Sequence, residues 1–113
     1  MSKYVFKICK TEEWKKALAI GSFQGTSMDQ KDGFIHLSSI EQVKKTLELH
    51  FKNINNLYIL KVSTKGMKLI WEKSRSGVKF PHLYNTFKIT SVHKIFILTL
   101  NENGTYDLPD LKN

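Results

Sequence analysis

The sequence predicts one α+β domain, in which two helices pack on a mainly antiparallel β-sheet. Three observations support this fold class. The chain has 113 residues, which is the size of one domain, and shows neither linkers nor low-complexity segments. Hydrophobic residues make up 41% and charged residues 25%, as in ordinary globular proteins. Segments typical of strands outnumber the two segments with helical periodicity, so we expect a single domain over residues 1–113.

The first two elements are predicted to be a strand and a helix. Tyr4 to Cys9 is rich in residues that favour strands. Thr11 offers a hydroxyl for an N-cap, and Gly21 is typical of a helix end, which places a helix between them. Its apolar stripe is predicted to contain Trp14, Ala17 and Leu18.

The next segments are predicted to be a loop, a short strand and a second helix. The stretch from Gly21 to Gly33 is polar and glycine-bearing, which favours a surface loop. Gly33 to Ser38 reads as a short strand. Ser38 and Glu41 have the spacing of a capping box, which predicts a helix over about residues 39–51. Its buried stripe is predicted to contain Ile40, Val43, Leu47 and Phe51.

The second half of the chain is predicted to be mostly strands. Leu57 to Ser63 and Met67 to Lys73 are predicted to form a hairpin across a turn at Lys65–Gly66. Ser74 to Pro81 is predicted to be a loop, and Val92 to Leu100 a last strand.

Composition excludes several classes of protein. The longest strongly apolar stretch, Ile95 to Leu98, is far shorter than the roughly 20 residues of a membrane-spanning helix. The first residues lack the pattern of a secretory signal or transit peptide. A lone cysteine, Cys9, cannot form an intrachain disulfide. We therefore expect a cytoplasmic protein that has no membrane partner.

The charge is unevenly distributed. Lys and Arg total 18 against 10 Asp and Glu, a formal net charge of +8. From residue 51 to residue 100 the only acidic side chain is Glu72. Such a half-chain attracts anions. Because all basic residues except Arg75 are lysines, whereas base-reading proteins rely on arginine, nucleic acid is the less favoured partner and a solvated surface the simpler reading.

His36 is the first candidate site residue. In a strand over Gly33 to Ser38, alternation places Ile35 and Leu37 on one face and Phe34, His36 and Ser38 on the other. His36 then points away from the core, where an imidazole is suited to ligand binding or proton transfer. A structural histidine bonded to the loop backbone is an equal alternative.

The segment after Trp71 and Glu72 supplies the other candidates. Arg75 stands out because a guanidinium offers a planar fork of donors that suits phosphate or carboxylate. A tie from Arg75 to Glu72 is the structural alternative. Further along, Phe80, His82 and Tyr84 alternate with Leu83, so rings are expected on one side, either for stacking on a flat ligand or for packing of the loop.

Other constellations are weak. His36 and His82 do not have a third ligand at a spacing that supports a metal site. His50 near a helix end and His93 in a strand fit structural roles. Cys9 lies in an apolar strand, where a thiol is more often inert than nucleophilic.

Two blocks, GFIHLS and FPHLY, identify a resemblance. Together with Tyr4–Cys9 and the Trp71–Arg75 segment, they resemble the small, mostly bacterial "domain of unknown function 952" family. The resemblance runs from about residue 4 to residue 109. It implies a fold similar to the catalytic core of ADP-ribosyltransferases, which split NAD in a cleft between two small sheets. The fold class is thus α+β with a split sheet.

The resemblance implies a cleft but does not imply a particular reaction. Gly33 to Ser38 falls where those enzymes have the strand that borders nicotinamide. Their first-strand histidine has no counterpart at Lys7 or Ile8, and Val92 to Leu100 has no glutamate. The cofactor therefore stays open, with NAD or a related nucleotide as the candidate.

The leading hypothesis is a protein that binds a small anionic ligand, either a nucleotide or another phosphate-bearing molecule, and that acts as a transferase or hydrolase if it is catalytic. His36, His82 and Arg75 are the candidate catalytic residues, and the expected ligand contacts are Phe34, Ser38, Trp71, Glu72, Ser74 and Tyr84. The alternatives are a non-catalytic basic module that docks on RNA or on an acidic protein, and a purely structural role for both blocks. The sequence leaves the substrate and the oligomeric state open.

Overall fold

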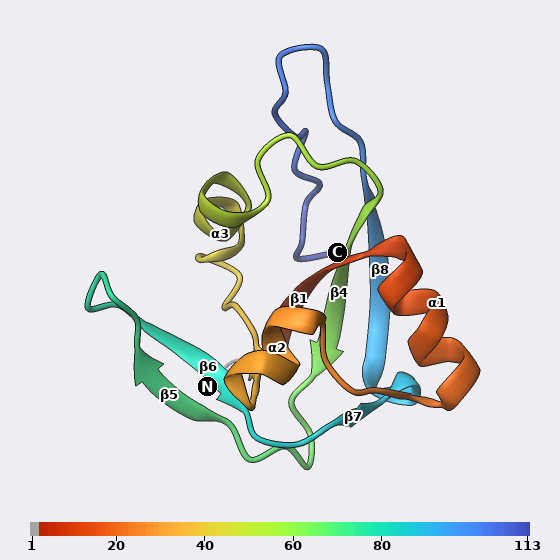
Figure 1. The fold of residues 1–113 in the computed structure, drawn as a ribbon, viewed down its shortest axis with the longest axis vertical. Coiled ribbons are helices and arrows are strands. Elements are labelled where there is room, and N and C mark those ends of the chain that lie inside the picture. The colour runs from red at the N-terminus through yellow and green to blue at the C-terminus, as the bar shows by residue number, and fades with distance from the viewer. Residues whose placement is uncertain (1–2) are drawn as a thin grey trace.

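Two three-stranded antiparallel sheets and one two-stranded ribbon form the framework of the computed structural model, which describes residues 3–113 (Figure 1). The main sheet has the order β1-β4-β8, the second sheet has the order β3-β6-β5, and β2 pairs with β7. The strands are β1 (Tyr4–Lys10), β2 (Ser22–Phe23), β3 (Ile35–His36), β4 (Leu57–Ser63), β5 (Ile70–Lys73), β6 (Lys79–Leu83), β7 (Phe87–Lys88) and β8 (Val92–Leu98). The helices are α1 (Thr11–Ile20), α2 (Ser27–Asp32), α3 (Val43–His50) and the 3-10 turn η1 (Ile89–Ser91). The α+β class is confirmed.

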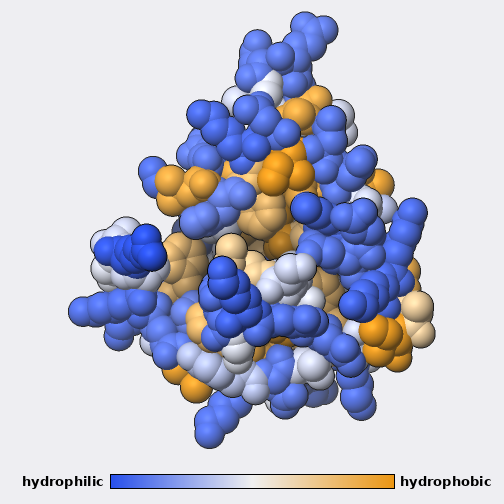
Figure 2. All heavy atoms as spheres, in the orientation of Figure 1, coloured by the Kyte–Doolittle hydropathy of each residue, from blue (hydrophilic) through white to orange (hydrophobic). Residues whose placement is uncertain are grey.

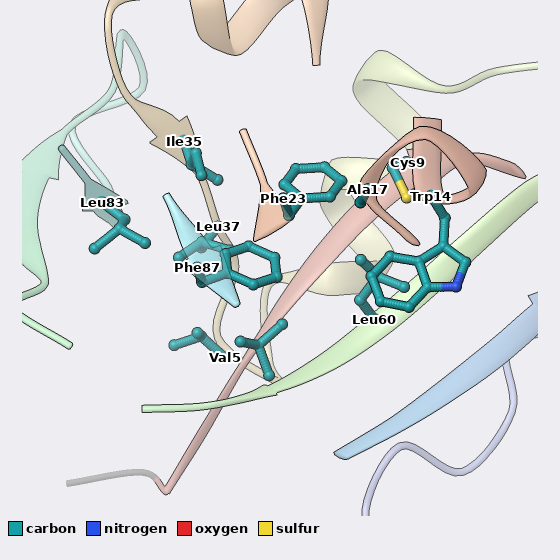
Figure 3. Packing of buried hydrophobic residues seen from close by; sticks show 11 residues of the cluster. Val5, Cys9, Trp14, Ala17, Phe23, Ile35, Leu37, Leu60, Leu83 and Phe87 are labelled. Carbon is teal, nitrogen blue, oxygen red and sulfur yellow. The ribbon is translucent and has the colours of Figure 1, made fainter. Parts of the chain in front are cut away.

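β1 and β4 of the main sheet are buried on both faces, and successive side chains of β1 point to two different apolar clusters. Val5 and Cys9 belong to one apolar cluster, with α1 and the second sheet, whereas Phe6 and Ile8 belong to another, with α3 and the C-terminal segment. Figure 3 shows the first cluster, in which side chains from β1, α1, β2, β3, β4, β6 and β7 converge. Lys7 lies between Val5 and Cys9 on this face and is 4% exposed, so its charge needs a partner inside the protein.

The predicted hairpin between the fourth and fifth strands is wrong. β4 lies at the centre of the main sheet, between β1 and β8, while β5 pairs with β6 in the second sheet. The predicted loop over Ser74 to Pro81 is also wrong, because Lys79–Leu83 forms β6 and residues 74–78 form a tight turn. This β5–β6 hairpin projects from the body of the molecule (Figure 1).

The predicted surface loop over Gly21 to Gly33 is wrong as well. It contains β2, whose Phe23 is 1% exposed, and α2, a helix in addition to the two that the sequence predicts. The six residues of α2 are closed at both ends: Thr26 caps the first turn and Gly33 adopts the left-handed conformation (φ 85°) after the last.

The other two helices depart from prediction at single positions. Lys10 rather than Thr11 is the N-cap of α1, and Glu13 Oε1 accepts a hydrogen bond from the Lys10 amide. Leu18 is 50% exposed and lies outside the buried stripe. α3 begins at Val43, later than predicted, because residues 40–42 form a turn in which Gln42 Oε1 accepts from the Ser39 amide.

The two larger sheets are joined directly. Phe6 of β1 and Ser38, just after β3, exchange two backbone hydrogen bonds of 2.8 and 2.9 Å. The histidine-bearing strand β3 is therefore anchored to the edge of the main sheet. Within residues 3–113, no helix is long and apolar enough to cross a membrane.

Candidate functional site

The second sheet brings the two sequence blocks side by side. His36 of β3 lies directly opposite His82 of β6, and their ring centroids are 5.6 Å apart. The neighbouring pair, Ile35 and Leu83, is buried in the core. Both imidazoles therefore lie on the face that points away from the core, as alternation predicts.

An aromatic cluster forms around these imidazoles. The ring of Phe34 stacks on His82 at a centroid distance of 4.1 Å and an interplanar angle of 27°. It also contacts His36 at 4.5 Å and Tyr84 at 5.1 Å. Phe34 thus links the GFIHLS and FPHLY segments, as the predicted shared site requires.

His82 is oriented by a carboxylate. Its Nδ1 lies 2.8 Å from Glu72 Oε1, and the Tyr84 hydroxyl donates to the same oxygen at 2.6 Å. An ionised carboxylate can only accept, so the proton of the neutral His82 ring is held on Nδ1 and Nε2 becomes an acceptor. The alternative prediction, that Glu72 ties down Arg75, is not what the structure shows.

Nε2 of His82 keeps contact with solvent. No hydrogen-bond partner is found for it within residues 3–113, yet no buried side-chain nitrogen or oxygen of that region lacks a partner. The unpartnered Nε2 is therefore not fully buried, although only 12% of the His82 side chain as a whole is exposed. A carboxylate-oriented imidazole with one reachable nitrogen can transfer a proton or bind a ligand.

The Tyr84–Glu72 hydrogen bond affects both groups. It is the main cause that lowers the pKa of Glu72, with His82 as the second cause. The same bond raises the pKa of Tyr84, because the phenol proton is retained by the carboxylate. The cluster therefore keeps Glu72 ionised, which maintains the orientation of His82.

His36 is held by two carboxylates instead of one. Its Nδ1 lies 2.6 Å from Asp29 Oδ1, and its Nε2 lies 2.9 Å from Asp32 Oδ2. The contact of Nδ1 with Asp29 is a hydrogen bond, and Asp32 lies within ion-pair distance of Nε2. With both nitrogens occupied, His36 has no free position for a ligand and acts as a tie between β3 and α2.

Asp29 is the centre of this second network. Only 2% of it is exposed, and its carboxylate binds Lys7 Nζ at 2.7 and 2.9 Å. It also accepts from the backbone amides of Thr26 and His36. Lys7 Nζ in turn donates to the His36 carbonyl at 2.9 Å, so the ammonium is well satisfied.

These contacts set the charge states of the pair. Burial by itself raises the pKa of Asp29, but the hydrogen bond from His36 and the charge of Lys7 outweigh it, and the pKa lies well below its usual value. Burial lowers the pKa of Lys7, and Asp29 acts against this shift. The backbone around Asp29 is tight: Gly25 has φ 108°, and a Cβ there would lie 2.9 Å from the Asp29 Cβ.

A surface hollow of about 230 Å³ adjoins the aromatic cluster. Phe34 and Tyr84 line it, together with Gln24, Asp29, Gln30, Gly33, Ile35, Asn85 and Thr86. Neither histidine lines this hollow; they border it through the ring of Phe34.

The remaining predicted site residues lie elsewhere. Ser38 is buried, and its hydroxyl lies 3.2 Å from the Thr46 hydroxyl of α3. Trp71 pairs with Pro81 and therefore lies on the opposite face of the second sheet from the histidines. Ser74 and Arg75 are exposed in the turn of the β5–β6 hairpin, where the Ser74 hydroxyl contacts that of Ser76. Arg75 thus lies in the turn beyond the end of β5 and not beside Glu72 within the strand.

Sequence reasoning missed Lys7, Asp29 and Asp32. Two signals were present. Lys7 interrupts a strand whose neighbours on both faces are apolar, which requires an internal counter-charge. Thr26 and Asp29 have capping-box spacing, with Gly33 at the position of a helix end. Both signals identify groups that need a partner, but neither identifies the partner.

Other candidates behave as structural residues. Cys9 is fully buried, and burial raises the pKa of its thiol to about 12, which keeps it protonated and unreactive. No group of three or more metal-ligating side chains suited to one ion occurs within residues 3–113. His50 is exposed at the end of α3, and His93 contacts the ring of Tyr4.

Comparison with known protein families identifies the family of this chain. Residues 8–95 match the family model described as "Protein of unknown function (DUF952)". The chain belongs to the DUF952 family. The matched range includes the GFIHLS and FPHLY segments and all the residues of the histidine clusters except Lys7.

Solved structures of a bacterial protein share this architecture. A crystal structure of protein CC0527 from Caulobacter crescentus is 39% identical, with a TM-score of 0.85 over 92% of this chain and 93% of that one. A solution NMR structure of CC0527 is 37% identical, with a TM-score of 0.77 over 91% and 90% of the two chains. Among curated proteins, none matches the chain. Membership of the DUF952 family therefore supplies a fold, and the function has to be argued from the site.

Proposed function

We propose that this DUF952 protein binds the flat ring of a nucleoside or nucleotide beside the aromatic cluster, with His82 as its proton donor or acceptor. The observation that carries the proposal is the state of His82: Glu72 holds Nδ1 at 2.8 Å, and Nε2 is accessible. A histidine in a purely packing role does not need an oriented and accessible nitrogen.

The surroundings of His82 suit a planar ligand. Phe34 and Tyr84 line the hollow, and Tyr84 is 51% exposed, so an aromatic face is offered to solvent. At about 230 Å³, the hollow is below the roughly 300–1,000 Å³ of pockets that enclose a whole drug-sized ligand. It therefore fits one ring of a nucleotide better than a complete dinucleotide.

The charges near the cluster argue for recognition of the ring rather than of phosphate. Asp29, Asp32 and Glu72 carry negative charges there, balanced in part by Lys7. We therefore place any phosphate groups away from this face. The position of Arg75 does not support the predicted phosphate contact with a ligand held between the histidines.

The proposal extends to an ADP-ribosyltransferase-like fold and to NAD as the first ligand to test. Two small antiparallel sheets joined at Phe6 and Ser38, with the His36 strand at the junction, support it. If the protein is catalytic, transfer or hydrolysis at a glycosidic or phosphate linkage is the matching reaction, with His82 moving the proton.

Histidine ring NMR tests ligand binding. We expect the ring signals of His82 to shift when NAD, nicotinamide or adenosine is added, while those of the exposed His50 stay unchanged. Unchanged His82 and His36 signals at millimolar concentrations of all three compounds would overturn the proposal.

A matched pair of variants tests the role of Glu72. Glu72→Gln removes the carboxylate that orients His82, whereas Glu48→Gln makes the same change on the exposed face of α3. We expect the first variant alone to weaken binding. If nicotinamide release from NAD is detected, His82→Ala is expected to lower its rate about 100-fold or more.

A further inference from the structure

The outer part of the β5–β6 hairpin combines cations with an exposed aromatic ring. Lys73 and Lys79 lie directly opposite each other, and Trp71 lies on the same face as both because positions alternate along a strand. The exposed fraction of Trp71 is 44%. Arg75 lies in the turn that closes the hairpin. We call Trp71, Lys73, Arg75 and Lys79 the basic hairpin surface.

This surface is distinct from the histidine site. Glu72, Phe80 and His82 occupy the alternate positions of β5 and β6, so their side chains lie on the opposite face of the hairpin. The one carboxylate of the hairpin, Glu72, is engaged with His82 and Tyr84. The cations therefore lack an acidic neighbour within their own hairpin.

Stability of the hairpin does not explain the arrangement. Like charges directly opposite each other on paired strands are destabilising. Within residues 3–113 the ion pairs involve Lys7, His36 and His82, and none includes Lys73, Arg75 or Lys79. Three concentrated positive charges on a projecting element suit a ligand that supplies several negative charges.

We propose that the basic hairpin surface binds single-stranded nucleic acid, with RNA as the expected class. Trp71 offers a face on which a base stacks, and the neighbouring cations follow the phosphates on either side. An acidic protein surface would satisfy the cations equally well, but its binding would not require an exposed tryptophan between them. The stackable ring is the observation that favours nucleic acid.

The projecting position of the hairpin agrees with this assignment. In Figure 1 the hairpin extends from the body at the side away from α1, with its turn at the far end. Figure 2 shows predominantly hydrophilic atoms at that edge of the molecule. A flexible strand of nucleic acid can reach the surface there without entering the hollow.

Binding of a 12-nucleotide oligouridylate, followed by fluorescence anisotropy, tests the proposal. If the three cations each neutralise one phosphate, the slope of log K against log salt is about −2, so affinity falls about 20-fold between 50 and 200 mM salt. Trp71→Ala is expected to weaken binding about tenfold and to abolish the quenching of exposed tryptophan emission; Trp14 is buried.

A matched charge control separates the hairpin from the general basicity of the chain. Lys73→Gln/Lys79→Gln is expected to weaken binding strongly, whereas Lys44→Gln/Lys45→Gln, an equal change in charge on exposed residues of α3, leaves it nearly unchanged. Equal loss in both double variants would overturn the proposal, because the attraction would then be diffuse.

Two further outcomes oppose the proposal. Absence of oligouridylate binding at 50 mM salt overturns it directly. If polyglutamate binds as tightly as RNA and Trp71→Ala changes neither, the surface serves an acidic protein instead. Glu72→Gln, which tests the histidine site on the opposite face, is expected to leave oligouridylate binding unchanged, so the two proposals fail separately.

Discussion

The two histidine clusters of the second sheet use similar groups in opposite ways. His36 and His82 are neighbours across paired strands, and each has a carboxylate at its Nδ1. Asp29, the partner of His36, is 2% exposed and also binds Lys7, whereas the side chain of Glu72, the partner of His82, is 41% exposed. The clusters differ in burial and in how many of their polar atoms are already engaged.

That difference assigns the two clusters different roles. In the Asp29 cluster Nδ1 of His36 and the ammonium of Lys7 are hydrogen-bonded, and Asp32 lies 2.9 Å from Nε2 of His36, so the group stabilises the docking of α2 on the sheet. In the Glu72 cluster one nitrogen of His82 is left to interact with a ligand. Residue type alone does not make a histidine a candidate for ligand binding; it also needs an available ring nitrogen.

The largest expected effect separates the clusters by stability. Asp29→Asn leaves Lys7 buried without its counter-charge and is expected to lower the free energy of unfolding by about 3–5 kcal/mol. Glu72→Gln is expected to lower it far less, because the pair is solvated. Urea denaturation measures both. Equal losses would contradict the division into structural and functional clusters.

The same denaturation experiment can test whether the unpaired charge of Lys7 causes the loss of stability in Asp29→Asn. Lys7→Met added to Asp29→Asn removes the unpaired buried charge, so the double variant is expected to be more stable than Asp29→Asn alone by about 1–3 kcal/mol. A double variant that is less stable than Asp29→Asn would show that Lys7 stabilises the fold without Asp29.

The stabilisation by the buried Asp29 cluster should also be lost in acid. The pKa of Asp29 in the folded protein lies below its unfolded value of about 3.9. The unfolded chain therefore takes up the proton first, and the stabilisation, complete above about pH 5, is lost as the pH falls below about 4. Urea midpoints between pH 7 and pH 3 should fall steeply for the unmodified protein and for Glu72→Gln. They should fall less for Lys7→Met/Asp29→Asn; equal slopes would argue against the assignment.

The smallest effect concerns the open cluster. Tyr84→Phe removes the main cause of the lowered pKa of Glu72, so that pKa is expected to rise. The free energy of unfolding should change little, because both groups are solvated. Carboxyl NMR titration measures the shift, with Glu48 as an internal reference. An unchanged Glu72 pKa would show that His82 alone holds the carboxylate ionised.

The sequence predicts the strands better than their partners. Alternation locates β1, β4 and β8 within two residues of their ends. It fails at β6, because Pro81 and the Ser-Arg-Ser-Gly run favour a loop, yet β6 is the central strand of its sheet. Pro81 is accommodated there because its carbonyl accepts from the Leu37 amide while it pairs with Trp71 on the other side. Local propensity was overruled by pairing between segments far apart in the sequence.

In the site, too, local features are predicted from the sequence and long-range contacts are not. Alternation correctly predicts that Phe34 and His36 share one face and that His82 and Tyr84 share another, because that pattern is local. The contact of Lys7 with Asp29 joins residues 22 positions apart, and their pairing depends on how α2 packs on β1. The polar composition of residues 21–33 predicted exposure to solvent, whereas Asp29, the central residue of the buried cluster, is itself buried.

The seam between the two larger sheets has a mechanical consequence. Phe6 and Ser38 are joined by two backbone hydrogen bonds, and Lys7, next in the chain to Phe6, reaches the carbonyl of His36. Hinge motion between the sheets would have to break all three bonds together. Any rearrangement that accompanies ligand capture is therefore expected in the protruding arm formed by β5 and β6, whose far end can bend while the imidazoles keep their spacing.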